Sequence, residues 1–114
     1  MRNNHRVAPK LAETKHRSFA RERLDQDVKD IHATINRLRM DAYRDFEANK
    51  TQYVEAARKD HTEYPELEVY ERYKQTDTDI LARRENLLRQ AYEKHGFNYE
   101  KEAYALKQKF NVSR

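Results

Sequence analysis

The sequence contains no cysteine, a single glycine and only two prolines among its 114 residues. Without cysteine, disulfide scaffolds, thiolate zinc sites and cysteine nucleophiles are excluded. Because glycine and proline build most tight turns, their scarcity argues against a many-stranded sheet and against glycine-rich phosphate loops. No run approaches the roughly 18 consecutive apolar residues that a membrane-spanning helix needs. A few long helices remain as the expected architecture.

Large apolar residues are also scarce. Leu, Ile, Val and Phe together number 20 of 114 residues, whereas 39% of the residues are charged. Chains this poor in large apolar residues tend to be disordered when the net charge is high. Here, however, 24 basic residues nearly balance 20 acidic ones. We therefore expect a folded chain with a thin core, which gains further burial from another molecule.

The positive charge is concentrated near the N-terminus, where residues 1–24 hold seven basic side chains against two acidic ones. We divide the chain into a basic N-terminal arm, residues 1–23, partly extended, and a single helical hairpin domain, residues 24–114. Such an arm suits nucleic-acid phosphates, anionic lipid or an acidic protein surface. The predicted contacts with phosphates or an acidic partner are Arg2, Arg6, Lys10, Lys15, Arg17, Arg21 and Arg23.

A first long helix is predicted upstream of Pro65. The stretch Leu11–Asp60 has neither glycine nor proline, and the residue before a proline leaves α geometry. We expect the first ten residues to be extended and the helix to begin between Pro9 and Ser18. Pro65 itself is suited to open a second helix.

The later helices have clearer punctuation. A polar stretch, Lys74–Asp79, predicts a break in the second helix, with Thr76 or Thr78 as an N-cap. Gly96 has the sequence context of a left-handed C-cap, and Asn98 is suited to cap a last helix. The sequence thus predicts an all-α fold: an extended helical hairpin of two long helices, at about 11–60 and 65–95, and a short C-terminal helix at about 98–110.

The clearest periodic pattern lies in the first helix, where apolar residues alternate at spacings of four and three, as in a coiled-coil seam. The predicted partner-binding seam is Leu24, Val28, Ile31, Ile35, Leu38 and Ala42. Beyond Ala42 the stripe rotates around the helix, so a kink or a change of packing partner is expected between Tyr43 and Asn49. Tyr43, Phe46 and Tyr53 are the predicted interface aromatics.

Eight tyrosines outnumber four phenylalanines. Tyrosine buries a large ring yet keeps a polar tip, which suits surfaces that are covered only when a partner binds. The other interpretation is that the tyrosines line the thin core of the hairpin. Both interpretations stay open for different tyrosines.

No catalytic or metal-binding pattern stands out: the five histidines lie far apart in sequence, and nucleophile and phosphate-loop motifs are missing. We expect no cofactor, no metal and no catalysis. Arg39 and Lys50 on one long helix, followed by Arg84 and Glu85 on a later one, resemble the helical chorismate mutases. That resemblance implies that these four side chains would bind a small dicarboxylate. The other interpretation is that they are exposed charges.

These features favour a non-catalytic structural or adaptor subunit of a larger multiprotein or ribonucleoprotein assembly, which binds its partners through helical stripes and the basic arm. One alternative is a homodimeric coiled-coil regulator that binds nucleic acid, and a second is the mutase-like enzyme. The expected partners are proteins, with nucleic acid as a further partner through its phosphates. Since the N-terminus lacks the apolar segment of a secretory signal, we expect an intracellular chain, cytoplasmic or organellar, with the mitochondrial matrix among the options.

Overall fold

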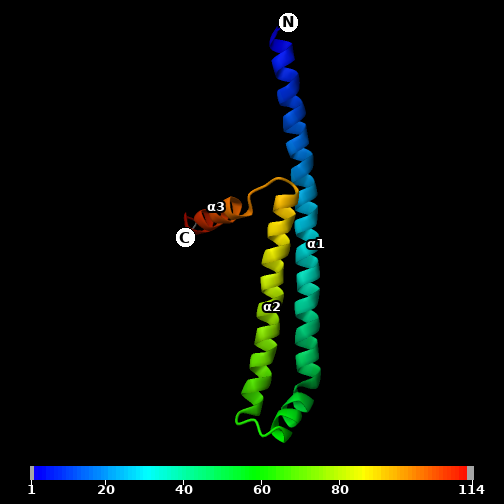
Figure 1. Cartoon of the computed structure of the whole chain (residues 1–114), viewed down its shortest axis with the longest axis vertical. Helices are drawn as coiled ribbons and strands as arrows, with labels where there is room; N and C mark the ends of the chain where they lie inside the picture. The colour runs from blue at the N-terminus through cyan, green and yellow to red at the C-terminus, as the bar shows by residue number, and fades with distance from the viewer. Residues whose placement is uncertain (1, 113–114) are drawn as a thin grey trace. The chain divides into compact units, whose positions relative to one another are not determined.

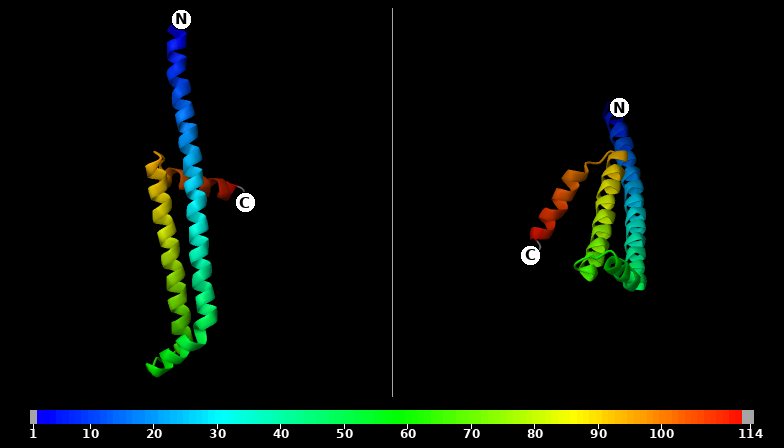
Figure 2. Two further views of the ribbon diagram at one scale, coloured as in Figure 1. Left: turned by 90° about the vertical axis from the view of Figure 1, so that its right-hand side faces the viewer. Right: turned by 60° about the horizontal axis from the view of Figure 1, so that its bottom comes forward.

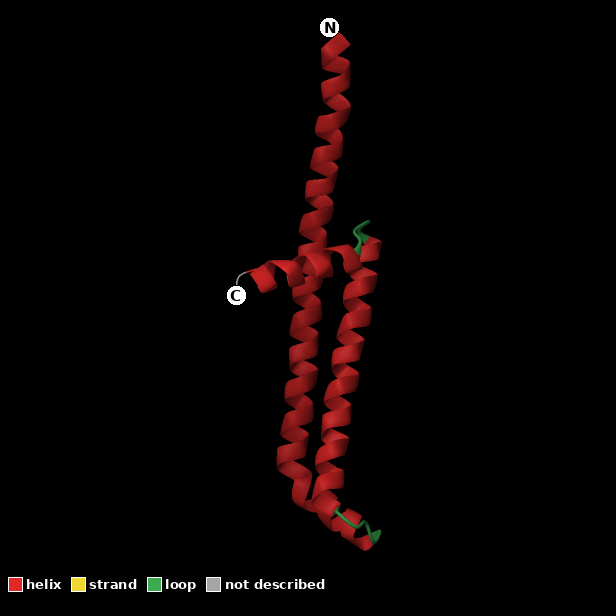
Figure 3. Ribbon diagram, turned by 90° about the vertical axis from the view of Figure 1, so that its left-hand side faces the viewer, coloured by secondary structure: helices red, strands yellow, loops and turns green. Residues whose placement is uncertain are grey.

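The computed structural model describes the backbone of residues 2–112 and the side chains of residues 18–108. Within that part of the chain it contains three helices and no strand (Figure 1). The helices are α1 (Arg2–Lys59), α2 (Pro65–Lys94) and α3 (Tyr99–Val112). The two long helices, α1 and α2, pack against each other, and loops occur at the two links between helices (Figure 3). The predicted all-α hairpin with a short C-terminal helix is confirmed.

The chain forms two compact units, and both include stretches of α1 and α2. The first, which we call the terminal unit, comprises residues 1–30 and 87–114. The second, which we call the turn unit, comprises residues 31–86. The division predicted from charge, an arm of residues 1–23 and a domain of residues 24–114, follows a different criterion and stays a prediction.

The first helix begins earlier than the sequence predicts. α1 starts at Arg2, so the predicted extended start, with helix onset between Pro9 and Ser18, is wrong. Pro9 lies inside the helix, where it lacks the N–H of one helical hydrogen bond. Its neighbours are largely alanine, leucine, lysine and arginine, which have the highest helix propensities and favour the helix on both sides of the proline.

α1 ends in a Schellman motif. His61 adopts the left-handed conformation, with φ 60°. Its backbone N–H donates to the carbonyl of Arg58 at 3.0 Å, and that of Thr62 donates to the carbonyl of Ala57 at 3.1 Å. These two hydrogen bonds satisfy carbonyls that a helix end otherwise leaves free. α2 then begins at Pro65, as predicted.

The end of α2 repeats this motif with a glycine. Gly96 has φ 81° and donates its N–H to the carbonyl of Glu93 at 3.1 Å, while Phe97 donates to Tyr92 at 2.8 Å. Asn98 then caps α3, because its side-chain Oδ1 accepts the backbone N–H three residues later at 2.9 Å. Both predicted caps are confirmed.

α2 runs unbroken through the polar stretch Lys74–Asp79, so the predicted break is wrong. The hydroxyl of Thr76 donates to the carbonyl of Arg72 at 3.1 Å, and that of Thr78 donates to the carbonyl of Lys74 at 3.0 Å. Threonine hydroxyls that bond four residues back are satisfied inside the helix, and therefore do not cap a new one.

The C-terminal part of α1 changes direction. In Figure 2 its last, green stretch leaves the line of the preceding part shortly before the link to α2. The helix nevertheless stays continuous to Lys59. The bend follows the segment Tyr43–Asn49, where the apolar stripe rotates around the helix and a kink is predicted.

The core is thin, as the composition predicts. Among the side chains of residues 18–108, six apolar ones are buried: Leu24, Ile35, Ala57, Val69, Leu88 and Ala91. Leu24 and Ile35, at 0% and 1% exposure, are the large side chains that are fully enclosed. Both belong to the predicted seam, whose other four members are half-buried. The seam thus packs inside the chain itself, and binding of a second chain through it stays a prediction.

Across the described residues, no helix combines the length and hydropathy needed to cross a membrane.

Candidate functional site

Aromatic side chains of the turn unit gather where α1 meets α2. Phe46 stacks on Tyr73, with ring centroids 4.7 Å apart and planes inclined by 18°. Tyr70 meets Phe46 edge-on at 6.4 Å, and Tyr43 lies tilted against Tyr73 at 6.2 Å. Such ring pairs contribute about 0.5–1.5 kcal/mol each beyond the area they bury. We call these four residues the aromatic cluster.

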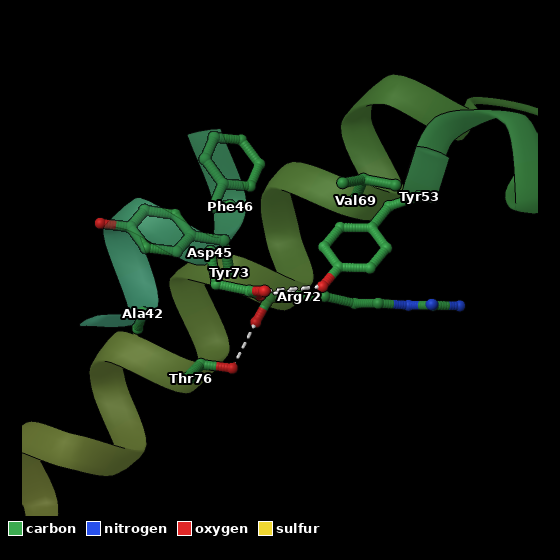
Figure 4. Close-up of a pocket in the computed structure, with 8 residues that line it drawn as sticks. All are labelled: Ala42, Asp45, Phe46, Tyr53, Val69, Arg72, Tyr73 and Thr76. Carbon is green, nitrogen blue, oxygen red and sulfur yellow. Dashed lines mark hydrogen bonds between the residues drawn. The ribbon is translucent and has the colours of Figure 1, made fainter. Parts of the chain in front are cut away.

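A groove of about 280 Å³ opens beside this cluster (Figure 4). Most of the lining side chains lie three or four residues apart on their own helix, the spacing that places residues on one helix face, and Tyr53 lies about two turns beyond Phe46. The lining residues are Ala42, Asp45, Phe46 and Tyr53 from α1, and Val69, Arg72, Tyr73 and Thr76 from α2. We call it the Asp45 groove.

Asp45 is the polar anchor of this groove. The hydroxyl of Tyr53 donates to its carboxylate, at 3.0 Å to Oδ1 and 2.9 Å to Oδ2, and Asn49 Nδ2 donates to Oδ1 at 2.9 Å. Figure 4 shows Tyr53 pointing its hydroxyl at Asp45. This hydrogen bond, together with desolvation, raises the pKa of Tyr53. Tyr53 is thereby fixed as a donor, and its ring forms one wall of the groove.

A second groove, of about 460 Å³, lies along the Tyr43 side of α1. Residues two positions apart on a helix point in nearly opposite directions, so Tyr43 and Asp45 face different sides. The lining residues are Asn36, Arg39, Met40, Tyr43, Arg44, Tyr73 and Asp77. We call it the Arg44 groove.

An ion pair crosses the Arg44 groove from α1 to α2. Arg39 Nε donates to Asp77 Oδ1 at 2.7 Å, and its Nη2 donates to Oδ2 at 3.2 Å. The hydrogen bond from Arg39 lowers the pKa of Asp77, and the charges of Arg39 and Lys74 act in the same direction. Asp77 is therefore a carboxylate whose charge is already compensated within the chain.

In the terminal unit, arginine–glutamate pairs join α3 to the other helices. Arg21 Nη1 donates to both carboxylate oxygens of Glu102, at 2.8 and 3.0 Å. Arg89 Nη1 donates to Glu100 at 2.7 Å. Each guanidinium also lies over an aromatic ring, 5.3 Å from its centroid for Arg21 and 5.2 Å for Arg89. Both groups thus combine an ion pair with a cation–π contact.

Asp27 ties α1 to the end of α2. Its Oδ2 lies 2.7 Å from His95 Nε2 and 3.8 Å from Lys94 Nζ. The hydrogen bond with His95 lowers the pKa of Asp27, and the charge of Lys94 adds to this. These three side chains and Arg23 lie along an open groove.

The structure places two of the seven predicted phosphate contacts. Arg21 is engaged by Glu102, whereas Arg23 is exposed beside the open groove at Asp27. Contact with phosphate stays a prediction for both. Outside the residues with described side chains lie Arg2, Arg6, Lys10, Lys15 and Arg17.

The four residues of the mutase resemblance have separate surroundings. Arg39 lines the Arg44 groove, and Lys50 lines another groove nearer the turn. On α2, Arg84 is half-buried and Glu85 is exposed. A shared substrate site for them stays a prediction. Within the part of the chain with placed side chains, no group of three or more His, Asp or Glu could hold a metal ion.

Each of the predicted interface aromatics lines a groove: Phe46 and Tyr53 line the Asp45 groove, and Tyr43 lines the Arg44 groove. The residues that sequence reasoning missed are those of α2, Val69 and Tyr73, which complete the grooves from the other side. Their spacing of four residues is a helix-face signal, but it does not reveal which residues of α1 they meet.

No protein family model matches this chain, and no curated protein or solved structure matches it either.

Proposed function

We propose that the chain is a non-catalytic structural or adaptor subunit of a larger multiprotein or ribonucleoprotein assembly, and that its turn unit binds a protein partner over the aromatic cluster. One observation carries the proposal. Over residues 18–108, nine large hydrophobic side chains are exposed, whereas six apolar ones, two of them alanines, are buried. Large exposed apolar patches on soluble proteins mark interaction surfaces.

The exposed side chains are concentrated in the turn unit. Six of the nine belong to it: Met40, Tyr43, Tyr53, Tyr64, Leu67 and Tyr70. Tyrosine and methionine are enriched at the centres of protein interfaces, because they supply large contact areas that tolerate water when free. At roughly 25 cal/mol per Å² of apolar area, covering these side chains would add the burial that the thin core lacks.

The polar groups beside the aromatic cluster also favour a protein partner. Two polar pairs beside the cluster are formed within the chain, Tyr53–Asp45 and Arg39–Asp77. A partner that covers the rings would therefore not leave these groups unsatisfied, which is the usual cost of burying a polar rim. Nucleic acid as a further partner rests on the charge of residues 1–24.

Affinity purification from the native source, with the wild-type chain and two variants, tests this function. The test variant combines Tyr43→Ser and Tyr70→Ser, which remove half-exposed rings of the aromatic cluster. The control is Tyr104→Ser, which removes an exposed ring from α3. We expect the proteins recovered with wild type and with the control to be lost with the test variant, while its helical circular dichroism persists. Recovery of the same proteins with all three chains would contradict the proposal. It would also be contradicted if the wild-type chain were recovered with no other protein.

A further inference from the structure

We infer that the Arg44 groove binds an acidic amphipathic helix of a partner protein, with the partner's apolar residues against Met40 and Tyr43 and its carboxylates against Arg44. The inference rests on the proposed function, to which it adds the site and the chemistry of the partner. It is carried by the shape of the groove, by its apolar floor and by the charge at its edge.

The shape comes from two packed helices. Met40 and Tyr43, three residues apart on α1, lie on one side of the groove, and Tyr73 of α2 lies on the other, with its ring 6.2 Å from that of Tyr43. A hairpin of two helices leaves the groove between them open on each side. A third amphipathic helix, with apolar residues at intervals of three and four, fits such a groove as in a three-helix bundle.

The apolar part of the groove lining is accessible. Met40 is 53% exposed and Tyr43 is 52% exposed, and both line the groove. Tyr43 packs against the ring of Tyr73 and therefore loses little side-chain freedom when a partner helix binds, whereas the flexible Met40 side chain adapts to the partner's shape. The neighbouring Tyr70, which meets Phe46 edge-on, extends the apolar surface along α2.

The edge of the groove carries unpaired positive charge. The lining includes two arginines and one aspartate. Arg39 and the nearby Lys74 already compensate Asp77. Arg44 is exposed and makes no ion pair or hydrogen bond with any residue whose side chain is described. A guanidinium in this position is suited to bind a carboxylate with two parallel hydrogen bonds.

The same charge comparison disfavours other sites and occupants. In the Asp45 groove Arg72 Nη2 donates to Glu68 at 2.7 Å, and Asp45 accepts from the neutral hydroxyl of Tyr53, so this groove presents no uncompensated cation to an acidic partner. That groove therefore does not favour an acidic partner helix. Nucleic acid binding depends on several phosphate contacts at once, whereas the lining of the Arg44 groove offers Arg44 as its uncompensated cation.

A pair of labelled helical peptides tests the inference on the full chain by fluorescence anisotropy. Both are about 18 residues long, enough to form a helix, with leucine at intervals of three and four. One carries glutamate beside the leucines and the other carries lysine. We expect the glutamate peptide to bind at least about tenfold more tightly than the lysine peptide, a ratio that corresponds to roughly 1.4 kcal/mol.

Two charge reversals and two ring truncations locate the site. Arg44→Glu is expected to weaken the glutamate peptide about tenfold and to strengthen the lysine peptide. The control Arg83→Glu makes the same change in net charge on an exposed arginine outside the groove lining. Tyr43→Ser should weaken both peptides, whereas Tyr53→Ser, in the other groove, should leave both within about twofold.

Several results would overturn the inference. They are equal affinity for the two peptides, equal effects of Arg44→Glu and Arg83→Glu, and no binding of either peptide at roughly 1 mM. A dimer in sedimentation of the chain alone that Arg44→Glu dissociates would assign the groove to a second copy instead. If these results occur while the Tyr43→Ser, Tyr70→Ser chain still loses its partners from the native source, the proposed function survives without this inference.

Discussion

The terminal and turn units are built from stretches of the same two helices, but their contacts differ in chemistry. In the turn unit, rings from α1 and α2 pack together, with Phe46 stacked on Tyr73 at 4.7 Å. In the terminal unit, α3 is attached by two ion pairs, Arg21–Glu102 and Arg89–Glu100, and by one ring contact, in which Tyr92 meets Tyr99 edge-on at 5.2 Å. Ring packing depends on buried area, whereas exposed ion pairs weaken as salt screens them. Among the described side chains, three of the four ring–ring contacts thus lie in the turn unit, whereas α3 in the terminal unit depends more on ion pairs.

The largest expected effect tests what the two units share. Each has one large side chain that is fully enclosed, Leu24 in the terminal unit and Ile35 in the turn unit. Leu24→Ala and Ile35→Ala should each lower the free energy of unfolding by about 2–5 kcal/mol, because each leaves a cavity. Urea denaturation followed by circular dichroism measures this. The control Leu106→Ala removes an exposed leucine, and its effect should stay within about 0.5 kcal/mol. A loss below about 1 kcal/mol at Ile35 would contradict its role in the core.

Two double-mutant cycles test the difference between the units. The cycle of Phe46→Leu and Tyr73→Leu should give a coupling of about 0.5–1.5 kcal/mol that salt does not change. The cycle of Arg21→Gln and Glu102→Gln should give a smaller coupling of about 0.2–1 kcal/mol, because these side chains are 46% and 32% exposed. That second coupling should fall toward zero at about 1 M salt. Equal salt dependence in the two cycles would refute the comparison.

Substitutions at the two helix C-caps should change stability by smaller amounts, in opposite directions in the two units. His61 in the turn unit and Gly96 in the terminal unit occupy the same left-handed position of a Schellman motif. His61→Gly should stabilise the chain by about 0.5–1 kcal/mol. Glycine relieves a left-handed strain of about 1–2 kcal/mol in the folded chain, but it also raises the conformational entropy of the unfolded chain, which cancels part of that gain. Gly96→Ala should destabilise by about 1 kcal/mol. An added Cβ there meets no atom within 4 Å, so the cost comes from the backbone alone. Thermal unfolding of both variants checks the signs.

The sequence was sufficient to predict the fold where single residues have strong backbone preferences. Pro65, Gly96 and Asn98 mark the links between helices, and the structure uses all three as predicted. One error arose where such preferences are weak, and the other at Pro9, through which α1 continues because the helix already begins at Arg2. The predicted break in α2 failed because Thr76 and Thr78 bond to carbonyls of their own helix, an option equally open to a capping threonine.

The sequence predicted the residues of the candidate site on α1 but not their contacts with α2. Tyr43 and Phe46 follow the end of a regular apolar stripe on α1, and this pattern identified them. Their partners on α2, Tyr70 and Tyr73, depend on the register between the two helices, which the length and conformation of the turn determine. Periodicity within one helix carries no information about that register. The pairing of Arg39 with Asp77 escaped prediction for the same reason.

The smallest expected effect concerns acid, and it compares one carboxylate in each unit. Hydrogen bonds from His95 and Arg39 lower the pKa values of Asp27 and Asp77 below the ordinary value of 3.8. Because folding lowers each carboxylate pKa, the unfolded chain binds more protons than the folded chain in acid. The stability that each hydrogen-bonded carboxylate adds is therefore complete above about pH 3.8, and it is lost as the pH falls through the lower, folded-state pKa. Asp77→Asn and Asp27→Asn should therefore each flatten the acid limb of stability against pH.

The flattening should be greater for Asp77, because its side chain is 18% exposed and that of Asp27 is 35% exposed, so water screens the pair in the terminal unit more. Urea midpoints measured at a series of pH values between about 2 and 6 give both slopes. If Asp27→Asn flattened the acid limb more than Asp77→Asn, the terminal unit rather than the turn unit would hold the more strongly coupled carboxylate. The terminal unit would then depend on charge for its stability as well as for the attachment of α3.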